Sequence, residues 1–179
     1  MKKQFTTILA VVIVFLATPF TALAQNYSFS LDREEVHVFL NEDSSISLEY
    51  TFVFTNDSGA HVIDFVDVGM PNYTFTSISA DVDGTPVEFS IADYQGSGSG
   101  VAVTLGSESI QPGESGTVHV KVDGITEVLN PDSTDKNYAS FDFGPTWFGS
   151  DFVHGDTDLT VAFHLPPGVQ PSEPRFHVP

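Results

Sequence analysis

Hydrophobic and polar residues alternate along most of the chain after residue 26, and no long window shows helical spacing. The pattern is clearest in 46–55, 117–122 and 158–165, where Val, Leu, Ile or an aromatic residue fills every second position. Such alternation predicts antiparallel strands with one face on a core. The residues predicted to face inward are Ile46, Leu48, Tyr50, Phe52, Phe54, Val118, Val120, Val122, Leu159, Val161, Phe163 and Leu165. Further strands are predicted at 27–32, 34–40, 61–68, 73–82, 86–92, 101–105 and 137–143.

Turn residues separate these segments. Asp83-Gly84 lies between two alternating runs and predicts a β-hairpin. The glycine-rich stretch 95–100 predicts a flexible hairpin tip, because strands resume on both sides of it. About ten short strands at this spacing favour an all-β fold, an antiparallel β-sandwich of immunoglobulin-like character. A closed barrel is the alternative.

The two ends of the chain differ from its middle. Residues 1–24 carry Lys2 and Lys3, an apolar run and a terminal A-x-A pattern, which together predict a cleaved signal peptide. Cleavage after Ala24 leaves 155 of the 179 residues, enough for one domain over 25–168. Residues 169–179 are rich in proline and predict an exit linker, so the chain is expected to be a fragment of a longer protein.

The amino-acid composition indicates where this domain is located and which partners it does not bind. It has no cysteine, so apolar burial alone must hold it together, and a Cys-free exported chain with a short signal points to a prokaryote. Without Lys2 and Lys3 the mature chain has 4 basic and 24 acidic residues, a net charge of −20. Such a surface repels nucleic acid and anionic lipid headgroups, so we expect neither nucleic-acid binding nor membrane insertion of the mature domain. We expect an extracytoplasmic location, secreted or on the cell surface.

The order of motifs resembles one known family. "EEVHVFLNEDSSISLEYTFVF", "ISADVDGTPVEF", "SIQPGESGTVHVKVDG", Trp147 and "DLTVAFHLPPGV" follow one another along the chain. This order resembles the N-terminal extracytoplasmic domain of a family of predicted bacterial membrane proteins of unknown function. The resemblance implies an exported β-sandwich with a membrane anchor downstream, and it implies no catalytic residues.

The stretch 143–158, "FGPTWFGSDFVHGDTD", is the richest in chemistry. Asp151, His154, Asp156 and Asp158 offer three carboxylates and an imidazole to one cation, and oxygen-rich ligation suits Ca²⁺. No EF-hand pattern is present, and Asp and Gly also favour turns for conformational reasons. A capped turn before an edge strand is therefore the favoured interpretation, with a Ca²⁺ site as the alternative; no other cofactor is expected.

Trp147 and Phe148 form the second candidate site in the same stretch. Exposed on a loop, they would offer an aromatic platform to a sugar ring. A tryptophan buries a large apolar area, however, and a Cys-free sandwich needs such area. We therefore predict that they pack in the core or at a sheet corner, with ligand binding as the alternative.

Catalytic signatures are missing from the sequence. There is no G-x-S-x-G elbow, no zinc-binding histidine spacing and no cysteine nucleophile. We predict a non-enzymatic domain of a cell-surface or membrane-anchored protein that acts in adhesion, scaffolding or sensing, with a protein or glycan partner outside the cell. The alternatives are a carbohydrate- or Ca²⁺-binding module and a secreted glycoside hydrolase, which would need a cleft with two facing carboxylates and at least one perturbed pKa.

Overall fold

The computed structural model describes residues 26–175, so the predicted signal peptide lies outside the described residues. Nearly all regular structure in this range is β-strand, with one short 3-10 helix, η1 (Gly106–Glu108). The strands are β1 (Phe29–Leu40), β2 (Ile46–Asn56), β3 (Phe65–Met70), β4 (Ser77–Val82), β5 (Thr85–Ser90), β6 (Ser99–Thr104), β7 (Ser115–Ile125), β8 (Asn130–Pro131), β9 (Ala139–Ser140), β10 (Val153–His154) and β11 (Asp158–His164).

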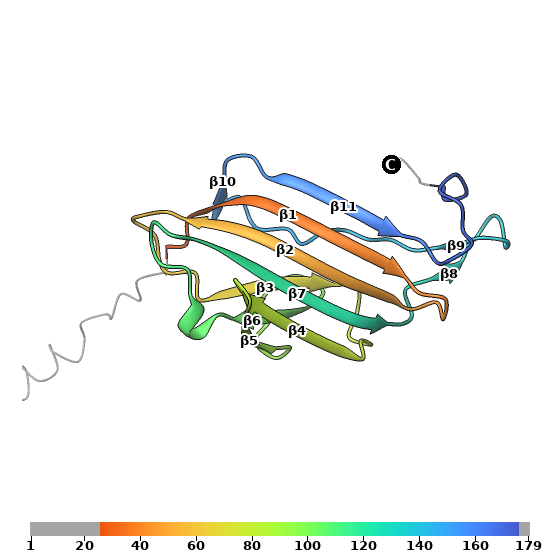
Figure 1. Ribbon diagram of the computed structural model, residues 1–179, viewed down its shortest axis with the longest axis horizontal. Coiled ribbons are helices and arrows are strands. Elements are labelled where there is room, and N and C mark those ends of the chain that lie inside the picture. Colours follow the sequence, from red (N-terminus) through yellow and green to blue (C-terminus); the bar gives the residue numbers. More distant parts are fainter. Residues whose placement is uncertain (1–25, 176–179) are drawn as a thin grey trace, which may run out of the picture.

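Nine of these strands form one curled sheet (Figure 1). The order along the sheet is β10-β1-β2-β7-β4-β5-β6-β3, and β11 also pairs with β1. The long strands β11, β1, β2 and β7 lie side by side in the upper layer of the figure, with β3 and β6 beneath them. The predicted all-β sandwich is confirmed, although β10 and β11 run parallel to β1.

Strand β5 forms the corner at which the sheet folds over. Its first half pairs with β4 and its second half pairs with β6. The predicted hairpin at Asp83-Gly84 leads into it, and both turn residues have positive φ, 49° and 88°, which suits a tight type I′ turn. One continuous ribbon therefore supplies both layers.

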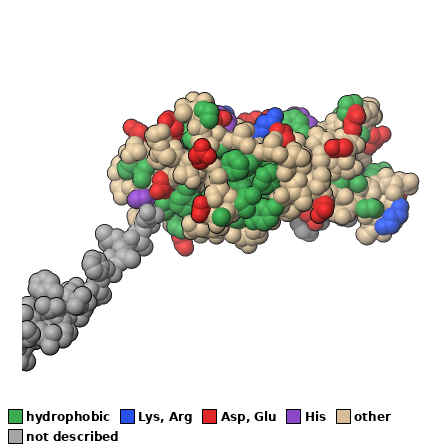
Figure 2. Space-filling view, turned by 90° about the horizontal axis from the view of Figure 1, so that it is seen from below, with side chains coloured by type: hydrophobic (Ala, Val, Ile, Leu, Met, Phe, Trp, Pro, Cys, Tyr) green, Lys and Arg blue, Asp and Glu red, His purple; other side chains and the backbone are tan. Residues whose placement is uncertain are grey.

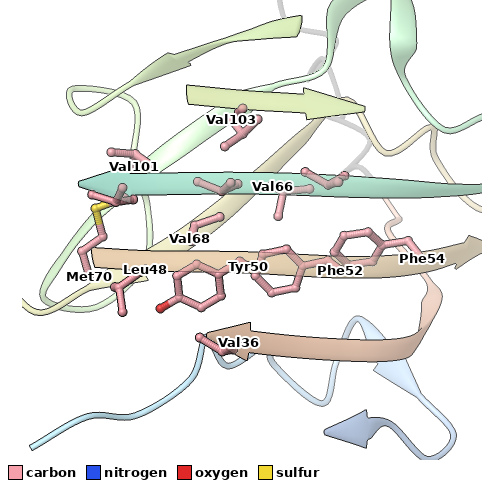
Figure 3. Packing of buried hydrophobic residues seen from close by; sticks show 14 of the residues in the cluster. Val36, Leu48, Tyr50, Phe52, Phe54, Val66, Val68, Met70, Val101 and Val103 are labelled. Carbon is pink, nitrogen blue, oxygen red and sulfur yellow. The ribbon is translucent and has the colours of Figure 1, made fainter. Parts of the chain in front are cut away.

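The core lies between the two layers. β2 contributes Leu48, Tyr50, Phe52 and Phe54, every second residue, all at most 1% exposed. Figure 3 shows these side chains lying opposite those of β3 and β6. The residues that meet them from the lower layer are Val66, Val68, Met70, Val101 and Val103. The inward face predicted for β2 and for Val118, Val120 and Val122 of β7 is confirmed.

The first predicted strand pair, 27–32 and 34–40, is a single strand in the structure. β1 runs without a break, and its register against β2 shifts between Leu31 and Arg33. This bulge lets Asp32 and Arg33 both face solvent and returns Glu34 to the buried side. The carboxyl group of Glu34 thus lies among the side chains of β1 that face the core.

The inward face predicted for β11 is wrong. Leu159 is 49% and Phe163 51% exposed, and only Val161 packs against the core. β11 pairs only with β1 among the described residues, and the lower layer does not extend beneath it. Phe163 instead meets the rings of Phe141 and Phe143, at centroid distances of 6.0 and 6.3 Å.

Carboxylates are scattered over the face seen in Figure 2, with hydrophobic side chains gathered near its middle and few positive ones. This matches the excess of 24 acidic over 6 basic residues. No helix within residues 26–175 is long and apolar enough to cross a membrane.

Candidate functional site

A long groove opens between β3 and the irregular segment 142–149. Its volume is about 880 Å³, which is large enough for an extended ligand. β3 is the last strand of the sheet and pairs only with β6 among the described residues. The lower layer therefore lacks a neighbouring strand at this edge, and the groove occupies that place.

The walls of the groove combine core side chains with carboxylates. Phe29, Phe54, Val66 and Met70 belong to the core and also line the groove. The charged side chains that line it are two aspartates, Asp67 and Asp142, and no Lys, Arg or His is among them. The groove is thus apolar within and negatively charged at its margins.

The segment 142–149 contains Trp147 and Phe148, the two aromatic residues singled out in the sequence. Their side chains point in opposite directions, one into solvent and one into the core. Phe148 points inward and meets Phe29, Phe52 and Phe54 edge to face, at 5.6 to 6.0 Å. Trp147 is 87% exposed and lines the groove. The prediction of packing is therefore wrong for Trp147, because the neighbouring Phe148 occupies the space against the core.

A closed ring of hydrogen bonds attaches this segment to the edge of β3. The Gly69 amide donates to Thr146 Oγ1 at 3.2 Å, and the Tyr50 hydroxyl donates to the Gly69 carbonyl oxygen at 3.3 Å. The hydroxyls of Thr146 and Tyr50 are also hydrogen-bonded to each other. Both backbone groups of Gly69 that point away from β6 thus find side-chain partners.

Beneath Thr146 lies a buried carboxyl group, that of Glu34. It is only 3% exposed, and its Oε1 has no hydrogen-bond partner among the described residues. Burial raises the pKa of Glu34 to about 7, although a hydrogen bond from the Thr146 backbone amide opposes the rise. A large share of these carboxyls is therefore protonated at neutral pH.

Asp67, on the groove wall, has a related environment. Its Oδ1 is buried and has no hydrogen-bond partner within residues 26–175, while its Oδ2 accepts a hydrogen bond from the Gln95 amide at 3.2 Å. Burial is the largest cause that raises the pKa of this carboxyl group. Sequence reasoning missed Glu34 and the partial burial of Asp67, because alternation alone does not distinguish a buried carboxylate from a surface one. The sequence carries no signal for Glu34, because the bulge that turns it inward is visible only in the structure.

Tyr94 packs over two glycines beside the groove. A Cβ atom on Gly96 or Gly100 would lie 2.3 Å from the Tyr94 side chain. The Tyr94 hydroxyl donates to the Ser97 carbonyl oxygen at 3.2 Å. Two glycines of the predicted flexible tip 95–100, Gly96 and Gly100, are thus needed to seat an aromatic ring on the groove wall.

The four residues of the alternative Ca²⁺ site, Asp151, His154, Asp156 and Asp158, do not converge. His154 Nε2 lies 3.0 Å from both carboxylate oxygens of Asp57. Asp158 begins β11 opposite Arg33 in the register with β1, and Asp151 and Asp156 are exposed. Across residues 26–175, no three His, Asp or Glu side chains are grouped so that they could hold a metal ion.

Comparisons with known proteins give only distant structural matches. No family model and no curated protein matches the chain. An M1 zinc metallopeptidase from Deinococcus radiodurans matches at 15% identity and a TM-score of 0.39, over 59% of this chain and 22% of the other. Native yeast LTA4 hydrolase matches at 16% identity and a TM-score of 0.41, over 65% of this chain and 19% of the other. The chain thus spans about a fifth of these proteins, and matches this weak carry no argument about its activity.

The fold and the groove together define the class of the described region. It is an all-β, sandwich-like domain with an apolar groove along the free edge of its last strand.

Proposed function

We propose that this chain is the extracytoplasmic binding domain of a prokaryotic cell-surface or membrane-anchored protein, without enzymatic activity, and that the groove along β3 takes an extended segment of a partner protein. The observation that carries this proposal is the groove itself. It is lined by core aromatic and aliphatic side chains and runs beside a strand that pairs on one side only among residues 26–175.

An extended peptide matches both features of the groove. A peptide strand uses the backbone groups of an exposed sheet edge for affinity and inserts every second side chain into pockets for specificity. On β3 these are the groups before Gly69, because those of Gly69 are already bonded to Thr146 and Tyr50. The apolar walls suit Val, Leu or Phe at those positions. Asp67 and Asp142, together with the net charge of −18 on the whole chain, favour Lys or Arg at the positions between.

The single tryptophan makes this proposal directly testable. Trp147 lines the groove, so its fluorescence reports on occupancy without a label. The probes are ten-residue peptides in which Val alternates with Lys, or Val with Glu. The Val-Lys peptide should shift the emission to shorter wavelength in a saturable way, and the Val-Glu peptide should not.

Two glycines provide a matched pair of variants. Gly144 lines the groove, and a Cβ atom there would have no atom within 4 Å, so Gly144→Phe places a ring at the groove lining without a clash at the backbone. Gly59 has equally open surroundings and lies outside the groove lining. Gly144→Phe should weaken peptide binding at least tenfold, and Gly59→Phe should leave it unchanged. Equal binding by both variants, or by both peptides, would contradict the proposal.

A carbohydrate ligand is the second candidate, and the exposure of Trp147 favours it. An indole ring that is 87% exposed on a loop is available to stack on a sugar. Wild type would then bind glycans on an array, Trp147→Ala would not, and neither peptide would bind. That result would identify a glycan, and not a protein segment, as the ligand of the groove. An array without signal would remove this candidate.

A further inference from the structure

We propose that His37 and His164 form a binding site for a divalent late transition-metal ion, with Cu²⁺ bound most tightly, on the solvent face of the β1–β11 strand pair. The site lies away from the groove and is independent of the function proposed for it. It rests on the one place within residues 26–175 where two imidazole rings meet.

Strand pairing brings the two rings together. β11 runs parallel to β1, with Ala162 opposite His37 and His164 opposite Phe39. His37 Nδ1 and His164 Nε2 are 2.7 Å apart, and the ring centroids are 5.0 Å apart. The distance between the ring centroids nearly equals the N···N distance plus the distance from each centroid to its own nitrogen. The two nitrogens therefore lie on the line between the rings and point at each other.

Glu35 determines which nitrogen of His37 is available. Its Oε1 lies 2.9 Å from His37 Nε2. A carboxylate at this position accepts the Nε2 proton, which leaves the lone pair on Nδ1, facing His164. A carboxylate that accepts a proton from the remote nitrogen of a histidine also makes that histidine a stronger metal ligand.

His164 can supply its second lone pair without a change in charge. In the hydrogen bond seen here, Nε2 carries the proton that His37 Nδ1 accepts. Transfer of that proton through solvent to the exposed Nδ1 of His164 keeps the ring neutral and frees Nε2. Phe39 stacks on the His164 ring at 4.2 Å and holds its plane.

The geometry favours a tetragonal ion. At metal–nitrogen distances of about 2.0–2.1 Å, two ligands at a right angle are about 2.9 Å apart, whereas a tetrahedral angle needs about 3.4 Å. The observed separation of 2.7 Å is nearer the first value, so tilting of the two rings is the main change required. Cu²⁺ and Ni²⁺ prefer such sites with nitrogen and oxygen ligands, and Cu²⁺ binds more tightly than Ni²⁺ or Zn²⁺. Water fills the remaining positions, because the site faces solvent.

The charges around the pair favour a cation. Glu35 contacts His37 directly, and Glu49 lies opposite His37 in the register with β2. Two basic side chains of the described residues lie on this face. Arg33 is four residues before His37 on β1, and the Nζ of Lys121 is held 3.0 Å from Glu49 Oε1.

The experiment measures Cu²⁺ and Ni²⁺ binding by calorimetric titration of the protein without a polyhistidine tag, at pH 7.5. Wild type should bind one equivalent of each ion, Cu²⁺ the more tightly. His37→Ala and His164→Ala should each lower the affinity at least tenfold. Glu35→Gln should lower it by about tenfold, because it removes only the carboxylate partner of His37.

His119→Ala is the matched control. His119 also lies on a strand and pairs with a carboxylate, Asp81, at 2.9 Å, but no second imidazole of the described part of the chain meets it. This variant should bind like wild type. The proposal is overturned if His164→Ala binds as tightly as wild type, or if His119→Ala loses as much affinity as His37→Ala. Thermal melts without metal verify that each variant is folded, since all three histidines are partly or fully exposed.

Discussion

Strands β2 and β11 have nearly the same alternating sequence pattern and opposite environments. β2 lies between β1 and β7, and Phe52 at its centre has no exposed surface. β11 pairs only with β1 among the described residues, and Phe163 near its end is 51% exposed. Both strands present an apolar face toward the same side of the sheet, but only β2 has a second layer beneath it.

The difference shows that burial depends on the second layer and not on the strand alone. β3 and β6 cover β2, whereas on the β1 side the irregular segment 142–149 takes the place of a further strand. The segment does not cover this side of the sheet completely, and the uncovered part is the groove. The same shortage of strands that exposes Phe163 also creates the candidate binding site.

The largest expected effect is at the covered strand. Phe52→Ala should lower the free energy of unfolding by about 3–5 kcal/mol, because it removes a fully buried ring and leaves a cavity. Denaturant titration followed by circular dichroism measures this loss. A loss of less than 1 kcal/mol would mean that the two layers do not pack around β2.

The next largest effect concerns Glu34 and has a defined pH dependence. Its pKa is about 7 in the folded protein against 4.5 for the free side chain, so between these pH values the folded state binds more protons than the unfolded state. Raising the pH through this window therefore lowers stability, by up to about 3 kcal/mol. Below the window this contribution is constant.

Glu34→Gln tests this sign. The amide cannot ionise and still offers an oxygen to the Thr146 amide, so the variant should gain stability relative to wild type as the pH rises from 5 to 8. Unfolding curves of both proteins at the two pH values isolate the contribution of this one group. A difference between the proteins that does not change with pH would show that Glu34 titrates normally and is hydrated.

A smaller loss is expected from breaking the ring of hydrogen bonds at β3. Thr146→Val removes the acceptor of the Gly69 amide and a hydrogen-bond partner of the Tyr50 hydroxyl. Buried groups left without partners cost about 1–3 kcal/mol. Thr160→Val, at an exposed position of β11, should change stability by less than about 0.5 kcal/mol in the same titration. Equal losses for the two variants would show that Thr146 does not hold the segment.

The smallest effect is expected at the uncovered strand. Phe163→Ala keeps the β1–β11 ladder and loses only ring contacts with Phe141 and Phe143, so its cost should be about 1 kcal/mol. A loss as large as that of Phe52→Ala would mean that β11 is covered in solution, for instance by a second copy of the chain. Sedimentation velocity of wild type would then show a dimer.

The sequence predicts most of the fold because hydrophobic and polar residues alternate without interruption in long strands of the sandwich such as β2. β2, β7 and the Asp83-Gly84 hairpin follow directly from this alternation. The bulge at Leu31–Arg33 is not predicted, since two separate strands explain the same pattern. Coverage is not predicted either: a strand's own residues do not specify whether another layer lies above them, which is why the inward face assigned to β11 is wrong.

The candidate site was predicted less completely than the fold. The stretch 143–158 is rightly singled out, and it contains Trp147 and part of the groove wall. The pattern cannot tell which of two adjacent aromatic residues points inward, because segment 142–149 is irregular and has no period. Asp67, Tyr94 and Glu34 come from distant strands and loops, and only the folded topology brings them near Thr146.

The account of the groove depends most directly on Trp147 lying in water at its edge. Acrylamide quenching of the single tryptophan measures this, with N-acetyltryptophanamide as the fully exposed reference. The account predicts quenching close to that of the reference and emission typical of hydrated indole, both reduced when the Val-Lys peptide binds. Emission at short wavelength with weak quenching in the free protein would place Trp147 inside the fold and contradict the account.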